Sequence, residues 1–177
     1  MKIFIIGPGG VGKSTCGAIL ANLLDYNFID LDVEFCERVK NVGIYINKYG
    51  YEKYCFENSK LFYDIMSQHL ENFIFSLSSG FLVHEGIDHL TLKHKQTLKD
   101  EGVSILLLPS TSLDTSTDIV LKRQLSRGFG LNKDREKIKF TQRFPIYKDF
   151  GDIKIFSHDK PEIIAEQMKK EIAFYNK

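Results

Sequence analysis

The sequence predicts an α/β fold in three layers, with a short parallel sheet of five strands and helices on both faces. Short runs of β-branched and aromatic residues alternate along the chain with longer segments whose apolar residues recur at helical spacing. Strands that alternate with helices form parallel sheets buried on both faces. The 177 residues show no internal repeat and no proline-rich linker, so we expect one domain over residues 1–177.

The predicted strands are short apolar runs that end near glycine, proline or polar residues. Such residues interrupt regular structure and therefore mark where each strand stops. The clearest strand precedes Pro109, and the first precedes a cluster of glycines. The five predicted strands are Lys2–Ile6, Phe28–Ile29, Phe73–Leu77, Val103–Leu108 and Lys154–Phe156.

The predicted helices follow from apolar residues that recur every three or four positions. Residues 33–72 are expected to be mostly helical, with breaks near Gly43 and Gly50, and the last helix opens at Pro161, since proline suits a first helical position. Residues Ser110–Thr117 are predicted as a polar loop. The first helix carries its apolar stripe on Cys16, Ile19, Leu20, Leu23 and Leu24.

Composition and charge exclude several classes of protein. Lysine and arginine total 24 against 23 aspartates and glutamates, a net charge of +1, so we expect no nucleic-acid partner. No apolar run approaches the ~20 residues that cross a bilayer, so we expect no membrane partner. Cys16, Cys36 and Cys55 form no CxxC pair, which favours a reducing compartment. A cytoplasmic monomer or weak homo-oligomer is predicted.

A glycine-rich segment between the first strand and the first helix predicts an ATP site. Residues 7–15, GPGGVGKST, fill the pattern G-x-x-x-x-G-K-[ST]. Glycines let backbone N–H groups approach phosphate oxygens, and the following helix points its positive end at the same anion. The lysine reaches the β and γ phosphates, and the next hydroxyl binds Mg²⁺. The expected contacts are Gly9, Gly10, Val11, Gly12, Lys13, Ser14 and Thr15.

Two aspartates follow the second strand, at the edge of the sheet where ligands bind. Asp30 and Asp32 are expected on an extended strand end, two residues apart. One carboxylate could hold Mg²⁺ through water, and the other could accept the proton of an attacking hydroxyl. A helix N-cap or a turn built from aspartates is the alternative.

These residues give the sequence a resemblance to the shikimate kinase family, small P-loop kinases of the nucleoside-monophosphate-kinase-like fold. The likeness runs nearly from end to end. It rests on the phosphate loop, on FIDLD at 28–32, on LSSGFLV at 77–83, where the family has a strand and three glycines, and on QRFPIY at 142–147, which looks like the family's Arg-x-Pro-x-Tyr helix. The resemblance implies transfer of the γ-phosphoryl group of Mg·ATP to a hydroxyl of a small, anionic acceptor.

The resemblance also implies roles for individual residues. Asp30 would help Ser14 to place Mg²⁺, and Asp32 would bind the acceptor hydroxyls. Arg127 would close over the phosphates, and Arg143 would clamp the carboxylate of the acceptor. Lys13 and Arg127 would stabilise the charge that develops on the transferred group.

The acceptor side departs from the family pattern. The family's acceptor-binding arginine falls at Cys55, in a helical region near residues 33–62, and a thiol cannot contact a carboxylate in bidentate fashion. The three glycines are reduced to Ser78, Ser79 and Gly80, of which only Gly80 keeps the freedom for a close backbone approach to the acceptor. The acceptor is therefore shikimate or a different small hydroxylated molecule.

The segment from 122 to 143 predicts a lid. It holds eight basic and two acidic residues, and glycines interrupt it, as expected of a flap that closes over phosphates. Closure would bring Arg127 to the γ-phosphate and leave Arg123 near the base or the α-phosphate. The basic residues at 133–139 could instead form a solvated helix face, or the segment could grip RNA.

Three histidines, His84, His89 and His94, recur every five residues. On one helix this spacing turns each side chain ~140° from the last, so the three cannot present one metal-binding face. We expect them on the surface.

Two other functions fit the sequence. A regulatory or adaptor protein could have kept the ATP site and lost the acceptor site, which Cys55 and the pair Ser78–Ser79 would favour. A nucleoside or nucleotide kinase would share the phosphate loop, because the loop alone does not set the acceptor.

Overall fold

The structure, a computed structural model, describes residues 1–68, 72–126 and 132–175. Its centre is a sheet of five parallel strands in the order β2-β3-β1-β4-β5. The predicted α/β fold and all five predicted strands are confirmed, with small differences in strand bounds. The strands are β1 (Lys2–Ile6), β2 (Asn27–Asp30), β3 (Phe73–Ser76), β4 (Val103–Leu108) and β5 (Ile153–Phe156).

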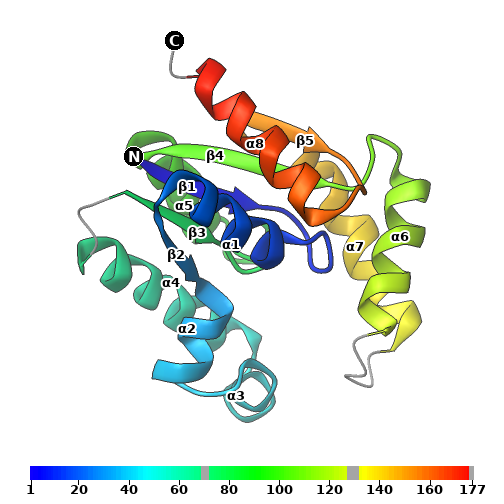
Figure 1. Cartoon of the computed structure of the whole chain (residues 1–177). Helices are drawn as coiled ribbons and strands as arrows, with labels where there is room; N and C mark the ends of the chain where they lie inside the picture. Colours follow the sequence, from blue (N-terminus) through cyan, green and yellow to red (C-terminus); the bar gives the residue numbers. More distant parts are fainter. Residues whose placement is uncertain (69–71, 127–131, 176–177) are drawn as a thin grey trace.

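Helices cover both faces of the sheet (Figure 1). Side chains of β1 alternate between the faces: Ile5 meets Gly17 of the first helix, whereas the ring of Phe4 packs on that of Phe62, with centroids 6.2 Å apart. No helix in the described ranges has the length and apolar character to cross a membrane. One face carries α1 (Lys13–Leu24) and α8 (Pro161–Tyr175), and the other carries α4 (Tyr51–Gln68), α5 (Asp88–Glu101) and α7 (Lys133–Lys148).

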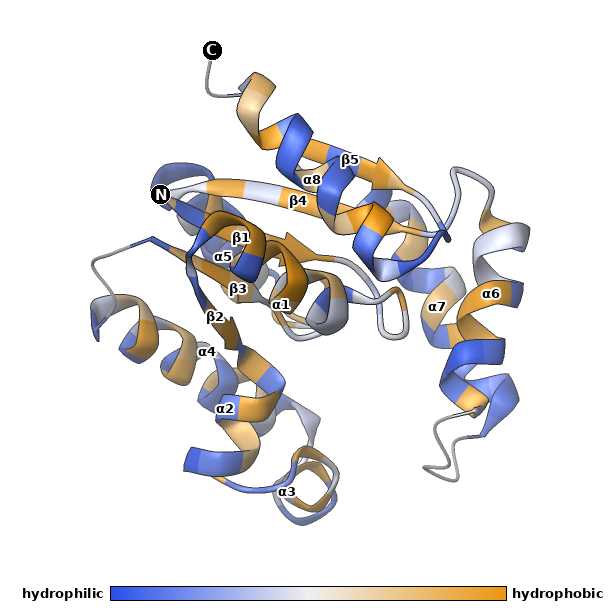
Figure 2. Ribbon diagram, in the orientation of Figure 1, coloured by the Kyte–Doolittle hydropathy of each residue, from blue (hydrophilic) through white to orange (hydrophobic). Residues whose placement is uncertain are grey.

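The hydrophobic core is centred on the sheet. Every side chain of β3 and β4 is buried, and the strands are largely apolar, whereas the helices show one apolar and one polar side (Figure 2). The ring of Phe62 on α4 lies 5.4 Å from that of Phe75 and 4.8 Å from that of Phe81. Parallel pairing of β2 with β3 and of β3 with β1 places their carboxyl ends side by side.

The region predicted to bind the acceptor, residues 33–62, is helical as expected. It consists of α2 (Leu31–Arg38), α3 (Val42–Tyr49) and the first part of α4. The first break lies at residues 39–41 and not at Gly43, because Asn41 caps α3 by accepting from the amide of Ile44 at 3.2 Å. The second break is at Gly50 as predicted, with a φ of 88° that favours glycine.

The predicted lid comprises the end of α6 (Leu113–Leu125) and most of α7, which pack together at one side of the molecule (Figure 1). Arg127 and the glycines at 128 and 130 lie outside the described residues. The expectation of a loop over Ser110–Thr117 is wrong in its second half. Ser112 caps α6 by accepting from the amide of Thr115, so the helix starts at Leu113.

The expectation of three surface histidines is wrong for two of them. His84 is 3% exposed and His94 0%, and only His89 lies on the surface. The three are not on one helix, because α5 begins at Asp88. His94 stacks on Phe81 with ring centroids 3.8 Å apart, and its Nε2 lies 2.8 Å from the hydroxyl of Ser59.

Candidate active site

The segment between β1 and α1 forms a loop whose backbone requires glycine. Gly7, Gly10 and Gly12 have φ values of 143°, 81° and 104°, a region that residues with a Cβ avoid. A Cβ on Gly7 would also lie 2.6 Å from the carbonyl oxygen of Leu107. Gly12 is the N-cap of α1, so the positive end of that helix faces the loop. The backbone therefore has the form that the phosphate-binding pattern predicts.

Lys13 folds back over this loop. Its Nζ donates to the carbonyl oxygens of Gly7, at 2.8 Å, and Pro8, at 3.0 Å. Beside it a cavity of about 210 Å³ opens between the loop, the start of α2 and the end of β3. The cavity brings Asp32 together with most of the predicted phosphate contacts. Its lining is Gly9, Gly10, Gly12, Lys13, Ser14, Thr15, Asp32, Ser76, Leu77, Ser79 and Gln124.

The two aspartates occupy different structural positions. Asp30 is the N-cap of α2, where its Oδ1 accepts from the amides of Asp32, at 3.0 Å, and Val33, at 3.3 Å. The N-cap alternative is thus confirmed for Asp30, whose Oδ2 can still accept from another group. α2 begins at Leu31, so Asp32 lies in the first helical turn, and the expectation of an extended strand end is wrong for it.

The carboxylate of Asp32 receives a short hydrogen bond. The hydroxyl of Ser78 donates to its Oδ1 at 2.6 Å. Asp32 is exposed on the side of the cavity, whereas its Oδ1 packs against the hydroxyl of Ser78 and loses water there. This loss of hydration raises the pKa of Asp32, whereas the bond from Ser78 and the charge of Lys13 lower it. Asp30, a second negative charge close by, raises the pKa further.

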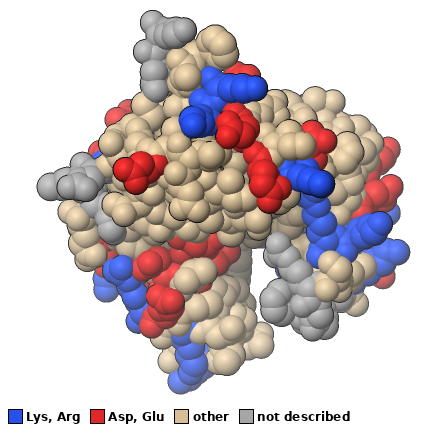
Figure 3. Space-filling view, in the orientation of Figure 1, with Lys and Arg blue, Asp and Glu red and all other residues tan. Residues whose placement is uncertain are grey.

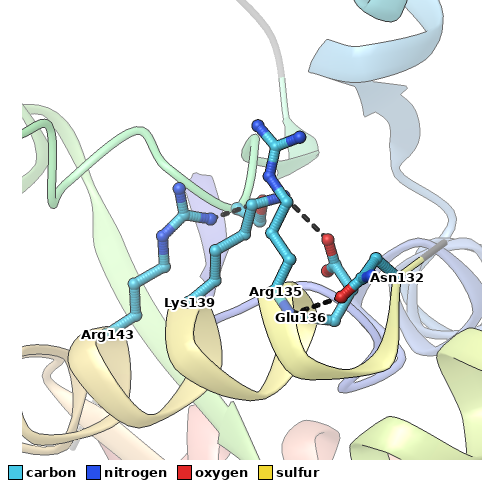
Figure 4. Close-up of polar contacts among 6 residues, drawn as sticks. Asn132, Arg135, Glu136, Lys139 and Arg143 are labelled. Carbon is cyan, nitrogen blue, oxygen red and sulfur yellow. Dashed lines mark hydrogen bonds and ion pairs between the residues drawn. The ribbon is translucent and has the colours of Figure 1, made fainter.

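Gly80 and Arg143 meet beside Ser79. Arg143 projects from α7, and its Nη1 donates to the hydroxyl of Ser79 at 3.2 Å (Figure 4). A Cβ on Gly80 would lie 3.4 Å from Nη2 of Arg143 and 2.7 Å from the hydroxyl of Tyr51. The hydroxyl of Tyr147, one turn after Arg143, donates to the carbonyl of Ser79 at 3.1 Å. These contacts attach α7 to the turn that follows β3.

A second cavity, of about 50 Å³, adjoins the first, since both are lined by Gly9, Ser79 and Gln124. Arg143 lines this smaller cavity together with residues of α6, α7 and the phosphate loop. The predicted carboxylate clamp and the predicted phosphate cradle therefore open into adjoining space.

The position of the family's second arginine is held by a neutral cluster. Cys55 is 0% exposed, and its Sγ lies 3.1 Å from Nδ1 of His84, which is also 3.2 Å from the hydroxyl of Tyr51. Burial, with the neighbouring charges of His94 and Arg143, lowers the pKa of His84 to about 4. Burial raises the pKa of Cys55 to about 11. At neutral pH this cluster carries no charge.

Arg123 lies on the far side of the phosphate loop. Its guanidinium donates to the carbonyl oxygens of Val11 and His158, both at 3.5 Å. It lines a cavity of about 370 Å³ between the loop and the start of α8, as do Val11, Cys16 and Pro161. This cavity adjoins the one that contains Asp32, since Gly10, Gly12 and Thr15 line both, and it lies at the end predicted for the nucleotide base.

Three residues of the site were not predicted from the sequence. The side chain of Gln124 lies against the phosphate loop, where a Cβ on Gly9 would come 2.8 Å from its Nε2. Tyr51 and His84 line the acceptor side, and no motif marks either of them. The sequence marked only the residues before two of them, since Gln124 follows the predicted nucleotide contact Arg123 and Tyr51 follows the predicted helix break at Gly50.

One side of α7 is basic, and its Lys139 and Arg143 line the smaller cavity, whereas Arg135 lines neither cavity. Arg135, Lys139 and Arg143 recur every four residues and lie along one side of the helix (Figure 4). Lys139 pairs with Glu136 at 2.7 Å. Basic side chains also gather over the α6 end of the molecule (Figure 3). The predicted lid arginine, Arg127, falls outside the described residues, so its position remains a prediction.

Known proteins resemble the chain over nearly its whole length. The family model for shikimate kinase matches residues 9–173. A shikimate kinase of Nitrosomonas europaea is 29% identical over 158 residues, 86% of this chain and 68% of that protein. One of Wigglesworthia glossinidia brevipalpis is 27% identical over 174 residues, covering 94% of this chain and 93% of that protein.

Solved structures share the fold. The shikimate kinase from Acinetobacter baumannii in complex with shikimate has a TM-score of 0.80 at 19% identity, over 98% of this chain and 93% of that one. The deoxyadenosine kinase from M. mycoides with bound dATP has a TM-score of 0.68 at 18% identity, over 98% of this chain and 100% of that one.

The parallel sheet and the glycine-rich loop after its first strand define a P-loop nucleotide-binding protein. The family model, which spans most of the chain, narrows this class. The chain belongs to the shikimate kinase family and is an ATP-dependent kinase that phosphorylates a hydroxyl group.

Proposed function

We propose that this kinase transfers the γ-phosphoryl group of Mg·ATP to a hydroxyl of a small anionic metabolite, and that shikimate is its acceptor. One observation carries the proposal: the phosphate loop and Asp32 line one cavity, and Arg143 lines the cavity next to it. An acceptor held at its carboxylate by Arg143 would therefore extend toward Asp32 and the γ-phosphate. The relatives named shikimate kinase support this choice of acceptor.

Mg²⁺ suits the oxygen atoms near the phosphate loop. The hydroxyl of Ser14 lies in the first turn of α1, and Asp30 retains one carboxylate oxygen beyond its capping bonds. Among the described residues no three His, Cys, Asp or Glu side chains form a cluster that could hold a metal. Mg²⁺ keeps several waters and binds through few protein oxygens plus phosphates, so this sparse set fits it. The bound ion would neutralise phosphate charge.

The phosphate contacts that we propose are the amides from Gly9 to Thr15 and the amine of Lys13. Lys13 now donates to two carbonyls of the loop, and a bound triphosphate would supply stronger, charged acceptors for it. Arg123 would contact the base or the α-phosphate, and Arg127 would approach the γ-phosphate when the lid over 122–143 closes.

We propose that Asp32 orients the acceptor hydroxyl and takes its proton. Its carboxylate lines the same cavity as Lys13 and Ser14, so an acceptor there lies in line with a phosphate held by the loop. Its pKa is raised by partial burial, which brings the carboxylate closer to the basicity that a general base needs.

The acceptor site would bind a carboxylate more weakly than two arginines would. Arg143 is charged, but the cluster around Cys55 is neutral. One missing charged hydrogen bond costs about 1.5–3 kcal/mol, or roughly one to two decades in affinity. We therefore expect a high KM for shikimate, with hydroxyls contributing more of the binding than the carboxylate does.

The test is acceptor-stimulated release of ADP. We would measure turnover of Mg·ATP with shikimate, other hydroxy acids, sugars and nucleosides, and identify the phosphorylated product by mass spectrometry. Stimulation by shikimate supports the proposal, and stimulation by nucleosides alone would replace it with a nucleoside kinase. Slow hydrolysis that no compound stimulates would favour the regulatory protein. Lys13→Ala should abolish Mg·ATP binding in calorimetry and serves as the negative control.

We also propose that the chain acts as one domain, as a monomer or weak homo-oligomer in the cytoplasm, without a nucleic-acid partner. The continuous core from β2 to β5 supports a single unit. Light scattering of the purified protein would test the oligomeric state.

A further inference from the structure

The turn after β3 places a buried hydroxyl against the carboxylate of Asp32. Ser78 is 3% exposed, and its Oγ donates to Oδ1 of Asp32 at 2.6 Å. That distance is in the range of hydrogen bonds between a hydroxyl and an ionised carboxylate, which are about twice as strong as neutral ones. The family that the chain belongs to has glycine at this position, so the contact comes from this chain's own side chain.

A second buried side chain holds the hydroxyl of Ser78 from its other side. Asn58, on α4 and 0% exposed, donates from Nδ2 to Oγ of Ser78 at 3.1 Å. An ionised carboxylate can only accept, so the single proton of Ser78 must point to Asp32. The hydroxyl oxygen is then free to accept, and the amide group of Asn58 must present its nitrogen. The three groups form one directed chain: Asn58 to Ser78 to Asp32.

The orientation of the Asn58 amide leaves its oxygen without a protein partner among the described residues. Oδ1 of Asn58 is buried and has no hydrogen-bond partner in the described part of the chain. A buried acceptor without a protein partner costs about 1–3 kcal/mol relative to a bonded one. If the amide of Asn58 were turned around, its oxygen would face Ser78, whose only hydroxyl proton is already donated to Asp32.

We propose that Ser78, oriented by Asn58, is a positioning residue for Asp32. The backbone of Asp32 is already held by the capping bond from its amide to Asp30. The bond from Ser78 adds a restraint on the side chain, which occupies Oδ1 and leaves Oδ2 to meet the acceptor hydroxyl. This inference rests on the proposed function, in which Asp32 orients the acceptor.

The experiment removes the hydroxyl and keeps its volume. In Ser78→Ala we expect kcat/KM for shikimate to fall about tenfold or more, as expected for loss of one hydrogen bond to a charged group. The loss should appear in kcat and in the KM for shikimate, whereas the KM for ATP should stay within about twofold. Ser78→Thr, which keeps a hydroxyl, should recover most of the activity.

Ser59→Ala is the matched control. Ser59 follows Asn58 on α4 and is 4% exposed. Its hydroxyl bonds to His94 and not to Asp32. It loses the same kind of buried hydroxyl, so we expect comparable destabilisation but nearly wild-type kinetics. If Ser59→Ala loses as much kcat/KM as Ser78→Ala does, the effect is structural and the inference fails.

Two further outcomes separate this inference from the proposed function. A wild-type enzyme that shikimate stimulates, with a folded Ser78→Ala that retains its full kcat/KM, overturns the inference alone. A wild-type enzyme that no acceptor stimulates overturns the proposed function and this inference with it. If Ser78→Ala fails to fold, Asn58→Leu tests the same series of hydrogen bonds. This variant keeps the hydroxyl of Ser78 and removes the amide that donates to it. A loss of about threefold or more in kcat/KM is then expected, and an unchanged value overturns the inference.

Discussion

Replacing Gly80 with alanine tests whether acceptor binding depends on the close approach of side chains to the backbone at this position. The added Cβ would lie 2.7 Å from the hydroxyl of Tyr51 and 3.4 Å from Nη2 of Arg143. Ordinary contact begins at 3.4 Å, so the hydroxyl must retreat by about 0.7 Å. Tyr51 is 37% exposed and can move outward, which lengthens its 3.2 Å contact with His84. Arg143 is at the limit of contact and has less need to move.

We expect a small loss of stability and a larger loss of acceptor binding. One weakened neutral hydrogen bond is worth about 1 kcal/mol, a change in Tm of roughly 2–4 °C in a chain of this size. Displacing groups that hold a substrate by a fraction of an ångström to an ångström can cost up to ~100-fold. We therefore expect kcat/KM for shikimate to fall about tenfold while the KM for ATP is unchanged. Thermal unfolding and steady-state kinetics measure the two effects.

The control is Gly43→Ala, in α3, where the nearest atom to the added Cβ is the Oδ1 of Asn41 at 3.4 Å. Alanine is favoured over glycine inside a helix by about 0.5–1 kcal/mol, so this variant should be as stable as the wild type or more so. The reasoning is refuted if Gly80→Ala raises the KM for ATP as much as that for shikimate. It is also refuted if stability falls while acceptor kinetics stay unchanged.

Three more predictions probe the rest of the site. Asp32→Asn should retain Mg·ATP binding in calorimetry and lose at least ~100-fold in turnover, and full turnover would remove Asp32 from its proposed role. Arg143→Ala should raise the KM for shikimate about 10- to 100-fold, whereas Arg135→Ala, the same loss of charge two turns earlier on α7, should change it little. Burial lowers the pKa values of His84 and His94 to about 4, below the ~6.5 of the unfolded chain. Between these two pH values the unfolded state takes up protons that the native state does not. Stability should therefore fall as the pH falls from about 6.5 to about 4, and urea unfolding that shows no such decline would contradict the buried neutral histidines.

The fold was predictable because each strand has a local signal in the sequence. β4 is a run of six buried residues, and β1 is followed by glycines that few other residues could replace. The phosphate loop was predictable for the same reason, since its chemistry depends on backbone geometry that only a particular short sequence can adopt. Local sequence was therefore enough to predict the strands of the sheet and the nucleotide end of the site.

The acceptor side was less predictable because its contacts join distant parts of the chain. Ser78 meets Asp32 across 46 positions, and Arg143 meets Ser79 across 64. Nothing in the spacing of the histidines shows that His84 packs under Cys55, because their neighbourhood is created by the turn after β3 and by α4. The start of α2 at Leu31 was missed because the capping bonds of Asp30 begin the helix directly after β2, with no loop between them.

The two halves of the site differ in what a substitution can change. The phosphate cradle is made mostly of backbone amides held by glycines with positive φ, and a side chain at Gly7 would meet the backbone of Leu107. Almost any change there removes nucleotide binding, so the cradle tolerates little variation. The acceptor side is made of side chains, which can be exchanged one at a time while the sheet stays intact. Cys55 lies in a neutral cluster with His84, and Ser78 donates to Asp32, and both residues are on the side that we propose for the acceptor. If hydroxyl recognition compensates for weaker carboxylate binding, Ser78→Ala should damage catalysis with shikimate more than it damages binding of ATP.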